Sequence, residues 1–351
     1  MAKPSISERT PLALYRKYRP AAFSEFRDQD TIVAVLTAAV EQKKIAHAYL
    51  FAGGRGTGKT SMARALAGAV GTSNNDIYEM DAASNRGIDE IRELREGVAT
   101  LPFESTYKFY IIDEAHALTG AAWGALLKTL EEPPEHVVFV LATTELDKVP
   151  ETIRSRCQVF QFKNPSHETL KKLVLDVAKK EGGSITPAGA ELVALMGDGS
   201  FRDTLGILQK VLTISEDKKL SEEEVASVVG APSSKTVNEF LEALCEKDMA
   251  SALKTFHGAI SRGTEPKVFT VLTLAKLRAV LLIRFAPDLK KELGEQFSED
   301  DIQALSEFAG PKGTALNAAL LAELITALLD MNRAPIPAIP LELALYRVFS
   351  V

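Results

Sequence analysis

The sequence is poor in the residues that mark secreted, metal-binding and membrane proteins. Its 351 residues include two cysteines, Cys157 and Cys245, which are far apart in the chain. Two distant cysteines exclude a disulfide framework and match no zinc-ligand spacing, which favours a reducing cytoplasm. No apolar run reaches the roughly 18 residues of a membrane-spanning helix, and the N-terminus lacks the apolar core of a signal peptide. We therefore expect a soluble, cytoplasmic protein.

Positive charge is not in excess either. Lysine and arginine number 41 against 47 aspartates and glutamates, which gives a net charge of −6. This balance argues against a globally basic nucleic-acid binder and leaves room for local basic patches. With 46% hydrophobic and 25% charged residues, the composition is that of an ordinary globular protein. The length suggests two or three domains with sizeable cores.

Residues 53–60 read Gly-Gly-Arg-Gly-Thr-Gly-Lys-Thr, which is the spacing of a phosphate-binding loop. Glycines let the backbone wrap until its N–H groups point at a polyphosphate. Lys59 would reach the β- and γ-phosphates, and the Thr60 hydroxyl would ligate Mg²⁺. A strand expected at 48–51 and a helix expected at about 60–70 favour ATP or GTP binding over a glycine-rich structural turn. The candidate nucleotide-binding residues here are Gly53, Gly54, Arg55, Gly56, Thr57, Gly58, Lys59, Thr60 and Ser61.

Apolar runs and helical patterns alternate through the first 165 residues. This alternation predicts a parallel sheet covered by helices on both faces. Thr119 is expected to cap one helix that Pro133 and Pro134 stop. The expected strands cover residues 48–51, 77–80, 109–112, 137–141 and 159–162.

From about Ser166 onward the pattern predicts helices only. Thr186 followed by Pro187 marks one helix start, and Ser221 with Glu224 forms a capping box at another. Residues 230–234 resemble a linker. Near the C-terminus an apolar stripe is broad enough for a helix buried on more than one side, either as intramolecular core or also as a subunit interface. The stripe consists of Leu316, Leu320, Leu321, Leu324, Ile325 and Leu328.

Polar residues follow two of the expected strands. Asp113 and Glu114 come at the carboxyl end of one, where ligands bind in parallel sheets. Asp113 would hold Mg²⁺ and Glu114 would polarise the water that attacks the γ-phosphate, unless both simply solvate a loop. Thr143 and Thr144 end the next strand, where one of them would complete the sensing of that water. Threonine is also commonplace at strand ends.

Two arginines pose a choice between surface and catalytic roles. Arg156 is either a surface ion-pair partner or an arginine finger that stabilises the transition state on a neighbouring subunit's γ-phosphate. Arg202 either pairs with Asp203 or folds over the nucleotide and couples domain position to occupancy.

The motifs together resemble one family. They are KYRP at 17–20, HAYLF at 47–51, DAASN at 81–85, IDEAH at 112–116, LLKTLEEPP at 126–134, ATT at 142–144 and SRC at 155–157. In this order they resemble the gamma/tau subunits of bacterial DNA polymerase III, the ATPases of sliding-clamp loaders. Single motifs recur across AAA+ proteins, whereas the SRC triplet with the 126–134 stretch is specific to clamp loaders.

The resemblance implies an α/β P-loop AAA+ domain at 1–165, a helical lid at 166–230 and an all-α collar at 231–351 that joins subunits into a ring. It implies ATP with Mg²⁺ as ligands. The implied roles are Arg156 as the finger, Arg202 as second sensor, Thr144 as first sensor, Thr143 at the nucleotide, and Arg16, Tyr18 and Arg19 along the adenine pocket. Those three could instead form a basic surface segment.

The resemblance also implies partners, namely delta- and delta-prime-like subunits, a sliding clamp and primed template DNA, with no membrane. Helix N-termini near Ser84, Asn85, Arg86 and Thr119 would track the DNA backbone without reading its sequence.

The chain departs from the family twice. Most relatives carry a four-cysteine zinc insertion, but residues 70–77 lack cysteine, so no zinc is expected because a tetrahedral site needs about four such ligands. The sequence ends at Val351 without the long tail of tau forms, which puts coupling to polymerase and helicase in doubt.

Two other function classes remain. A non-hydrolysing clamp-loader scaffold is disfavoured by intact Lys59, Thr60, Asp113 and Glu114. Another AAA+ motor, for branch migration or helicase loading, is disfavoured by the SRC triplet and the helical C-terminal third.

Overall fold

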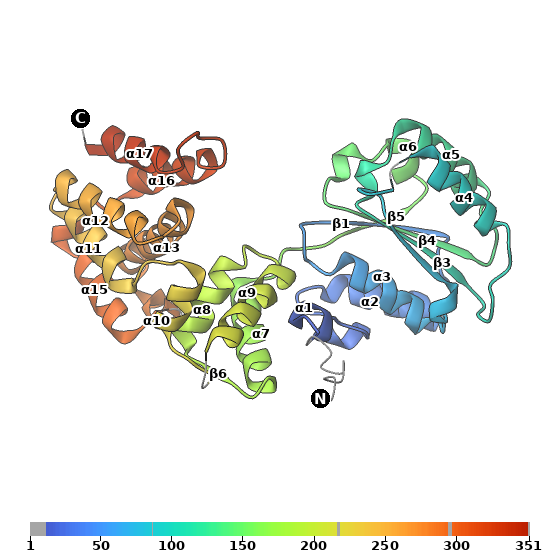
Figure 1. Cartoon of the computed structure of the whole chain (residues 1–351), viewed down its shortest axis with the longest axis horizontal. Helices are drawn as coiled ribbons and strands as arrows, with labels where there is room; N and C mark the ends of the chain where they lie inside the picture. Colours follow the sequence, from blue (N-terminus) through green and yellow to red (C-terminus); the bar gives the residue numbers. More distant parts are fainter. Residues whose placement is uncertain (1–11, 86, 216–217, 294–296, 350–351) are drawn as a thin grey trace, which may run out of the picture. The chain divides into compact units, whose positions relative to one another are not determined.

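The structure, a computed structural model, describes residues 12–85, 87–215, 218–293 and 297–349. The chain divides into two compact units (Figure 1). Unit 1 comprises residues 1–170 with 197–206, and unit 2 comprises residues 171–196 with 207–351. The expected three-part division at residues 165 and 230 stays a prediction.

Unit 1 is built on a five-stranded parallel sheet, as the sequence predicts. Its order is β2-β3-β4-β1-β5, so β1 lies between β4 and β5, although it comes first in the chain. Strands β1 and β4 are buried along their whole length because helices cover both faces. The strands are β1 Ala48–Ala52, β2 Ile77–Asp81, β3 Lys108–Asp113, β4 Val137–Thr143 and β5 Gln158–Gln161.

Successive strand residues point to opposite faces and pack against different helices. Helices α2 and α3 cover one face of the sheet, and α4 and α5 cover the other (Figure 1). Tyr49 and Phe51 pack with residues of α2 and α3, while Leu50 packs with residues of α4 and α5. The Thr119 hydroxyl accepts a hydrogen bond from Ala122 N at 3.2 Å, which confirms the predicted cap of α5. The helices wholly within unit 1 are α1 Leu14–Lys17, α2 Asp30–Glu41, α3 Lys59–Ala69, α4 Ile88–Val98, α5 Gly120–Glu131 and α6 Glu151–Arg154.

The elements of unit 2 that the structure describes are helices and one short strand pair. The predicted helix starts are confirmed, since Thr186 Oγ1 accepts from Gly189 N at 3.1 Å and Ser221 forms a capping box with Glu224. Helices α7 His167–Lys180 and α9 Phe201–Ile214 each contribute residues to both units. The helices wholly within unit 2 are α8 Pro187–Met196, α10 Glu222–Val229, α11 Ser234–Cys245, α12 Met249–Ser261, α13 Pro266–Phe285, α14 Lys290–Leu293, α15 Glu299–Ala309, α16 Ala318–Asp330 and α17 Ile339–Phe349.

The expectation of helices alone after residue 166 is wrong in one detail. Strands β6 Ser184–Ile185 and β7 Lys219–Leu220 pair in parallel. Two backbone bonds extend the pairing, from Ser184 N to Lys218 O at 2.8 Å and from Thr186 N to Leu220 O at 3.0 Å. A two-residue strand is too short to show a period-two pattern, so the sequence carries no signal for it.

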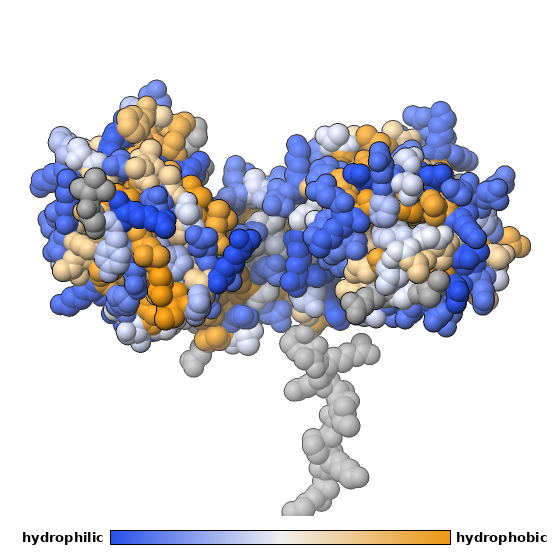
Figure 2. All heavy atoms as spheres, turned by 90° about the horizontal axis from the view of Figure 1, so that it is seen from above, coloured by the Kyte–Doolittle hydropathy of each residue, from blue (hydrophilic) through white to orange (hydrophobic). Residues whose placement is uncertain are grey.

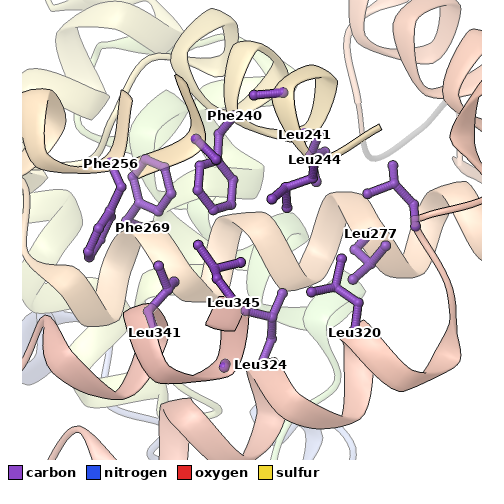
Figure 3. Packing of buried hydrophobic residues seen from close by; sticks show 14 of the residues in the cluster. Phe240, Leu241, Leu244, Phe256, Phe269, Leu277, Leu320, Leu324, Leu341 and Leu345 are labelled. Atoms are coloured by element: carbon purple, nitrogen blue, oxygen red, sulfur yellow. The ribbon is translucent and has the colours of Figure 1, made fainter. Parts of the chain in front are cut away.

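The core of unit 2 joins helices that are distant in sequence. The rings of Phe240 and Phe256 each meet Phe269 edge-on, with centroids 5.0 and 5.1 Å apart. Leu320 and Leu341 are fully buried in the same cluster (Figure 3). Edge-to-face aromatic pairs add to the free energy gained from burial, so this cluster anchors the C-terminal helices.

Within this chain α16 is buried on one side, not on the several sides that its broad stripe would allow, and the use of the stripe as a subunit interface stays a prediction. Leu320 and Leu324 are fully buried, but Ile325 is 47% exposed and Leu329 69% exposed. Leu343 and Tyr346 of α17 are exposed as well, and hydrophobic side chains reach the surface of this unit (Figure 2). Only one face of α16 packs into the core. Within the described ranges, no helix is both long and apolar enough to span a bilayer.

A buried ion pair ties α13 to α15 in unit 2. Lys276 Nζ lies 2.7 Å from Asp301 Oδ1, and the two side chains are 6% and 7% exposed. Ser234 Oγ donates to the same carboxylate at 2.6 Å and Asn238 Nδ2 at 3.0 Å. Burial alone would raise the pKa of Asp301, but the Lys276 ammonium and these donors hold that pKa below its ordinary value.

Lys276→Met should lower the free energy of unfolding by about 3–5 kcal/mol, because it leaves a buried carboxylate without its cation. The loss should shrink at acid pH, since the stability from a depressed carboxyl pKa is present above the unfolded pKa of about 3.9 and disappears as pH falls through the folded one. Urea unfolding followed by circular dichroism measures both effects. Lys235→Met is the control, because Lys235 pairs with Glu239 while its side chain is 85% exposed. If both variants lose the same free energy of unfolding, the buried ion pair does not have the stabilising role given to it here.

Candidate nucleotide-binding site

The loop between β1 and α3 has a backbone that only glycine adopts readily. Gly53, Gly56 and Gly58 have φ of 153°, 71° and 102°. A Cβ on Gly56 would lie 2.0 Å from Ser200 Oγ. The loop is tied to the sheet because Gly53 N donates to Thr143 O at 3.2 Å, and to α9 because Phe201 N donates to Gly56 O at 3.1 Å.

Lys59 is held at the centre of this loop. Lys59 is only 6% exposed, and its Nζ donates to Gly53 O and Gly54 O at 2.8 Å each. Burial lowers the pKa of Lys59, while Glu114 and Asp113 act in the opposite direction. Thr57 Oγ1 donates to Gly54 O at 2.9 Å and fixes the turn. A cation inside a glycine loop, at the start of an eleven-residue helix, fits a polyphosphate.

The two residues predicted to hold Mg²⁺ are brought together. Thr60 Oγ1 donates to Asp113 Oδ2 at 2.7 Å, which joins the first turn of α3 to the end of β3. Hydroxyl and carboxylate oxygens are the ligands that Mg²⁺ prefers. This donor set fits the magnesium ion of a magnesium–nucleotide complex.

Glu114 occupies an unusual backbone position beside this pair. Its φ is 48°, in the left-handed region that few non-glycine residues adopt and that clusters at functional sites. Its N–H donates to Asp113 Oδ1 at 3.0 Å, and its Oε2 accepts from Thr144 Oγ1 at 3.2 Å. The structure therefore brings the predicted water-activating carboxylate and first sensor into contact. The side chain of Thr143 is buried, and its Oγ1 accepts from Glu145 N at 3.0 Å.

Of the three N-terminal residues predicted at the adenine pocket, Arg19 is brought to the first turn of α3, directly after the loop. Its Nε donates to Ser61 Oγ at 2.9 Å, and burial lowers its pKa although Glu79 opposes that shift. The guanidinium carbon of Arg16 lies 5.8 Å from the ring centroid of Tyr15, and Tyr18 ends α1. The adenine-pocket role of the three stays a prediction.

Arg202 stands beside the loop as the second residue of α9. Its guanidinium carbon lies 5.9 Å from the Tyr15 ring centroid, and its charge helps to lower the pKa of Lys59. Sequence reasoning did not predict the contact of Tyr15 with Arg202. No spacing rule connects Tyr15 to a residue almost two hundred positions away.

Arg156 is not brought to the loop of its own chain. Its Nη2 lies 2.8 Å from Glu131 Oε1, and its Nη1 donates to Thr152 O at 2.7 Å. This is the surface ion pair that the sequence left as one alternative. The finger role on a neighbouring subunit stays a prediction.

His116 is a second residue that sequence reasoning missed. Its Nδ1 lies 3.1 Å from Thr143 Oγ1 and 3.4 Å from Glu114 Oε2. The available signal was its place two residues after Glu114, in the turn that follows β3. In a short 3-10 turn, Ala115–Ala117, the chain folds back toward the end of β4.

The residues predicted to track DNA lie at helix starts and turns. Thr119 caps α5, and Asp81 organises the turn at Ser84 and Asn85 by accepting from Ala83 N at 2.9 Å. Arg86 lies outside the described residues. In the described ranges, no three His, Cys, Asp or Glu side chains gather to hold a metal ion, and the expectation that zinc is not bound stays a prediction.

Two family models match the chain. One, described as the delta subunit of DNA polymerase III, matches residues 28–85 and 71–166. The other, described as domain III of DNA polymerase III subunits gamma and tau, matches residues 220–351. Between them they cover the sheet of unit 1 and the C-terminal helices of unit 2.

Curated relatives match most of the chain. DNA polymerase III subunit tau of Bacillus subtilis is 38% identical over 316 residues, which is 84% of this chain and 56% of the relative. The gamma/tau subunit of Mycobacterium tuberculosis is 34% identical over 96% of this chain and 62% of its own length. Subunit tau of Escherichia coli is 33% identical over 78% of this chain and 46% of its own length. The chain thus spans about half to three fifths of these relatives.

A solved structure supports the fold. The RuvB Holliday junction branch migration motor of Thermotoga maritima aligns with a TM-score of 0.53 and 22% identity. The alignment covers 65% of this chain and 80% of that one. At this identity the likeness shows the AAA+ fold alone.

Proposed function

Because the chain belongs to the DNA polymerase III gamma/tau subunits, we propose that it is the ATP-hydrolysing motor of a sliding-clamp loader. One observation carries the catalytic part of this proposal. The ends of β3 and β4 and the start of α3 bring Thr60 onto Asp113 and Thr144 onto Glu114, beside the loop that holds Lys59. These are the groups that phosphoryl transfer to water requires.

Each side chain has a distinct task in ATP hydrolysis. Thr60 and Asp113 would hold the magnesium ion, which neutralises charge on the phosphates when bound. Lys59 places a positive charge at the β- and γ-phosphates. Glu114 accepts a proton from the attacking water, and Thr144 orients the Glu114 carboxylate through the 3.2 Å bond.

The same geometry weighs against the two other function classes. A non-hydrolysing scaffold has no need of a carboxylate placed as that of Glu114 is. This residue has a left-handed backbone and contacts Thr144, just beyond the end of β4. A branch migration motor would share the AAA+ fold, but the helices of residues 220–351 match domain III of gamma and tau subunits. A clamp-loader motor accounts both for the carboxylate and threonine contacts at the sheet and for the helices at residues 220–351.

The proposed partners follow from family membership. They are delta- and delta-prime-like subunits in a ring, the sliding clamp that the ring opens, and primed template DNA. The start of α5 at Thr119 and the turn at Ser84 and Asn85 would meet the DNA backbone. Contacts of this kind go to phosphates and suit a chain whose net charge is −6.

Lys59→Ala should abolish ATP binding, because it removes the cation inside the loop. Glu114→Gln should leave ATP binding within about twofold and lower turnover by about 10²- to 10⁴-fold, since only the proton acceptor is lost. Binding of a fluorescent ATP analogue and phosphate release measure the two effects, with Glu41→Gln as the control on the exposed end of α2. Unchanged turnover in Glu114→Gln would refute the hydrolytic role.

The clamp-loading part needs its own test. ATP turnover of the assembled ring should rise when sliding clamp and primed template are added together. Absence of turnover in the assembled ring supports the scaffold, and turnover indifferent to the clamp supports another AAA+ motor.

Arg156→Ala should leave ATP binding by its own subunit nearly intact and depress turnover by about 10³-fold in the assembled ring only. The reason is that its guanidinium would act on the neighbour's γ-phosphate. Glu131→Gln is the matched control, because it removes the 2.8 Å ion-pair partner and leaves the guanidinium free to act. An equal loss of turnover in the isolated chain and in the ring would show that the finger assignment is wrong.

A further inference from the structure

His116 lies between the ends of β3 and β4, where three oxygen atoms face its ring. Nδ1 is 3.1 Å from Thr143 Oγ1 and 3.4 Å from Glu114 Oε2, and Nε2 is 3.3 Å from Glu145 Oε1. The ring is 17% exposed, whereas the Glu114 side chain is 33% exposed and Glu145 46% exposed. The imidazole is therefore more enclosed than either carboxylate beside it, and the Thr143 side chain is fully buried.

The two edges of the ring meet different parts of unit 1. The Nδ1 edge faces Glu114 and the buried Thr143 hydroxyl, whose position is fixed because it accepts from Glu145 N at 3.0 Å. The Nε2 edge faces Glu145, which also pairs with Lys148 Nζ at 2.8 Å. A ring held on both edges has a defined orientation, so it can define the orientation of its neighbours.

Glu114 needs such a neighbour. Among the described residues, its carboxylate accepts one side-chain hydrogen bond, from Thr144 Oγ1 at 3.2 Å, and it also lies beside the His116 ring. A glutamate has three side-chain torsions, and a single contact does not fix them. The 3.4 Å approach of Nδ1 places a hydrogen-bonding edge beside the same Oε2 atom that Thr144 holds.

We propose that His116 is a positioning residue for Glu114, acting through its Nδ1 edge, while Glu145 anchors the ring through Nε2. This inference rests on the proposed ATP hydrolysis by Glu114. His116 does not touch the nucleotide. It keeps the carboxylate in the orientation from which it accepts the proton of the attacking water.

Two substitutions separate the edges of the ring. In His116→Asn the amide nitrogen takes the place of Nδ1, and in His116→Gln it reaches toward the place of Nε2. His116→Ala should lower kcat by about tenfold, as expected when one polar contact that orients the carboxylate is lost, and leave KM for ATP within about twofold. His116→Asn should recover kcat to within about threefold of the parent, whereas His116→Gln should remain near the alanine variant.

The measurement is steady-state ATP turnover of the full chain assembled with its partner subunits. Equal recovery by the two amides, no recovery by asparagine, or a loss that appears in KM instead of kcat would overturn the positioning role. Thermal unfolding of each variant identifies one that fails to fold. If His116→Ala proves unfolded, the asparagine and glutamine variants still decide between the two edges.

A double substitution separates this inference from the proposed function. In single-turnover measurements, adding His116→Ala to Glu114→Gln should change the rate by less than about twofold, because a residue that acts through Glu114 has nothing left to position. A further tenfold loss would show that His116 acts independently of Glu114. If Glu114→Gln alone keeps full turnover, the proposed hydrolysis fails instead.

Discussion

The parallel register of β1, β3 and β4 is the constraint on which the site depends. Ala52 pairs with Thr143, and Ile112 pairs with Leu141, so the three strands end at one edge of the sheet. The glycine loop, the carboxylate pair and the threonine pair leave the sheet from that edge. A shift of one residue in the register would turn every strand side chain to the opposite face. The two packed faces of the sheet exclude such a shift, so the core fixes the geometry of the site.

How much the sequence predicts depends on how local each signal is. Short stretches of fewer than about ten consecutive residues predict the five strands, the glycine loop and the caps at Thr119 and Ser221. The structure confirms these elements. The contacts of Arg19 with Ser61 and of Arg202 with Tyr15 join distant residues and could not be predicted from spacing. Exposure of Ile325 was missed for a related reason, because an apolar stripe does not say how many neighbours will cover it.

The ion pair of Arg156 with Glu131 is compatible with a role on a neighbouring subunit. The two side chains are 35% and 43% exposed, and a pair of this kind contributes at most about 1 kcal/mol. Releasing the guanidinium therefore costs little compared with the charge stabilisation that an arginine finger provides in a dry site. The pair at Arg156 differs in this respect from Lys276 and Asp301, which are almost fully buried and whose separation is costly.

Helix α9 begins beside the candidate nucleotide site and continues into the helical part of the chain. Residues 201–206 belong to unit 1, where Arg202 stands beside the glycine loop, and residues from Ile207 onward belong to unit 2. An α-helix is hydrogen-bonded continuously along its axis, so a movement at its first turn displaces the turns that follow. Under the proposed function, a γ-phosphate that draws Arg202 away from Tyr15 would move the start of α9. Coupling would then require no relay of separate side chains, because a single helix is shared by the part proposed to bind ATP and the part that carries the C-terminal helices.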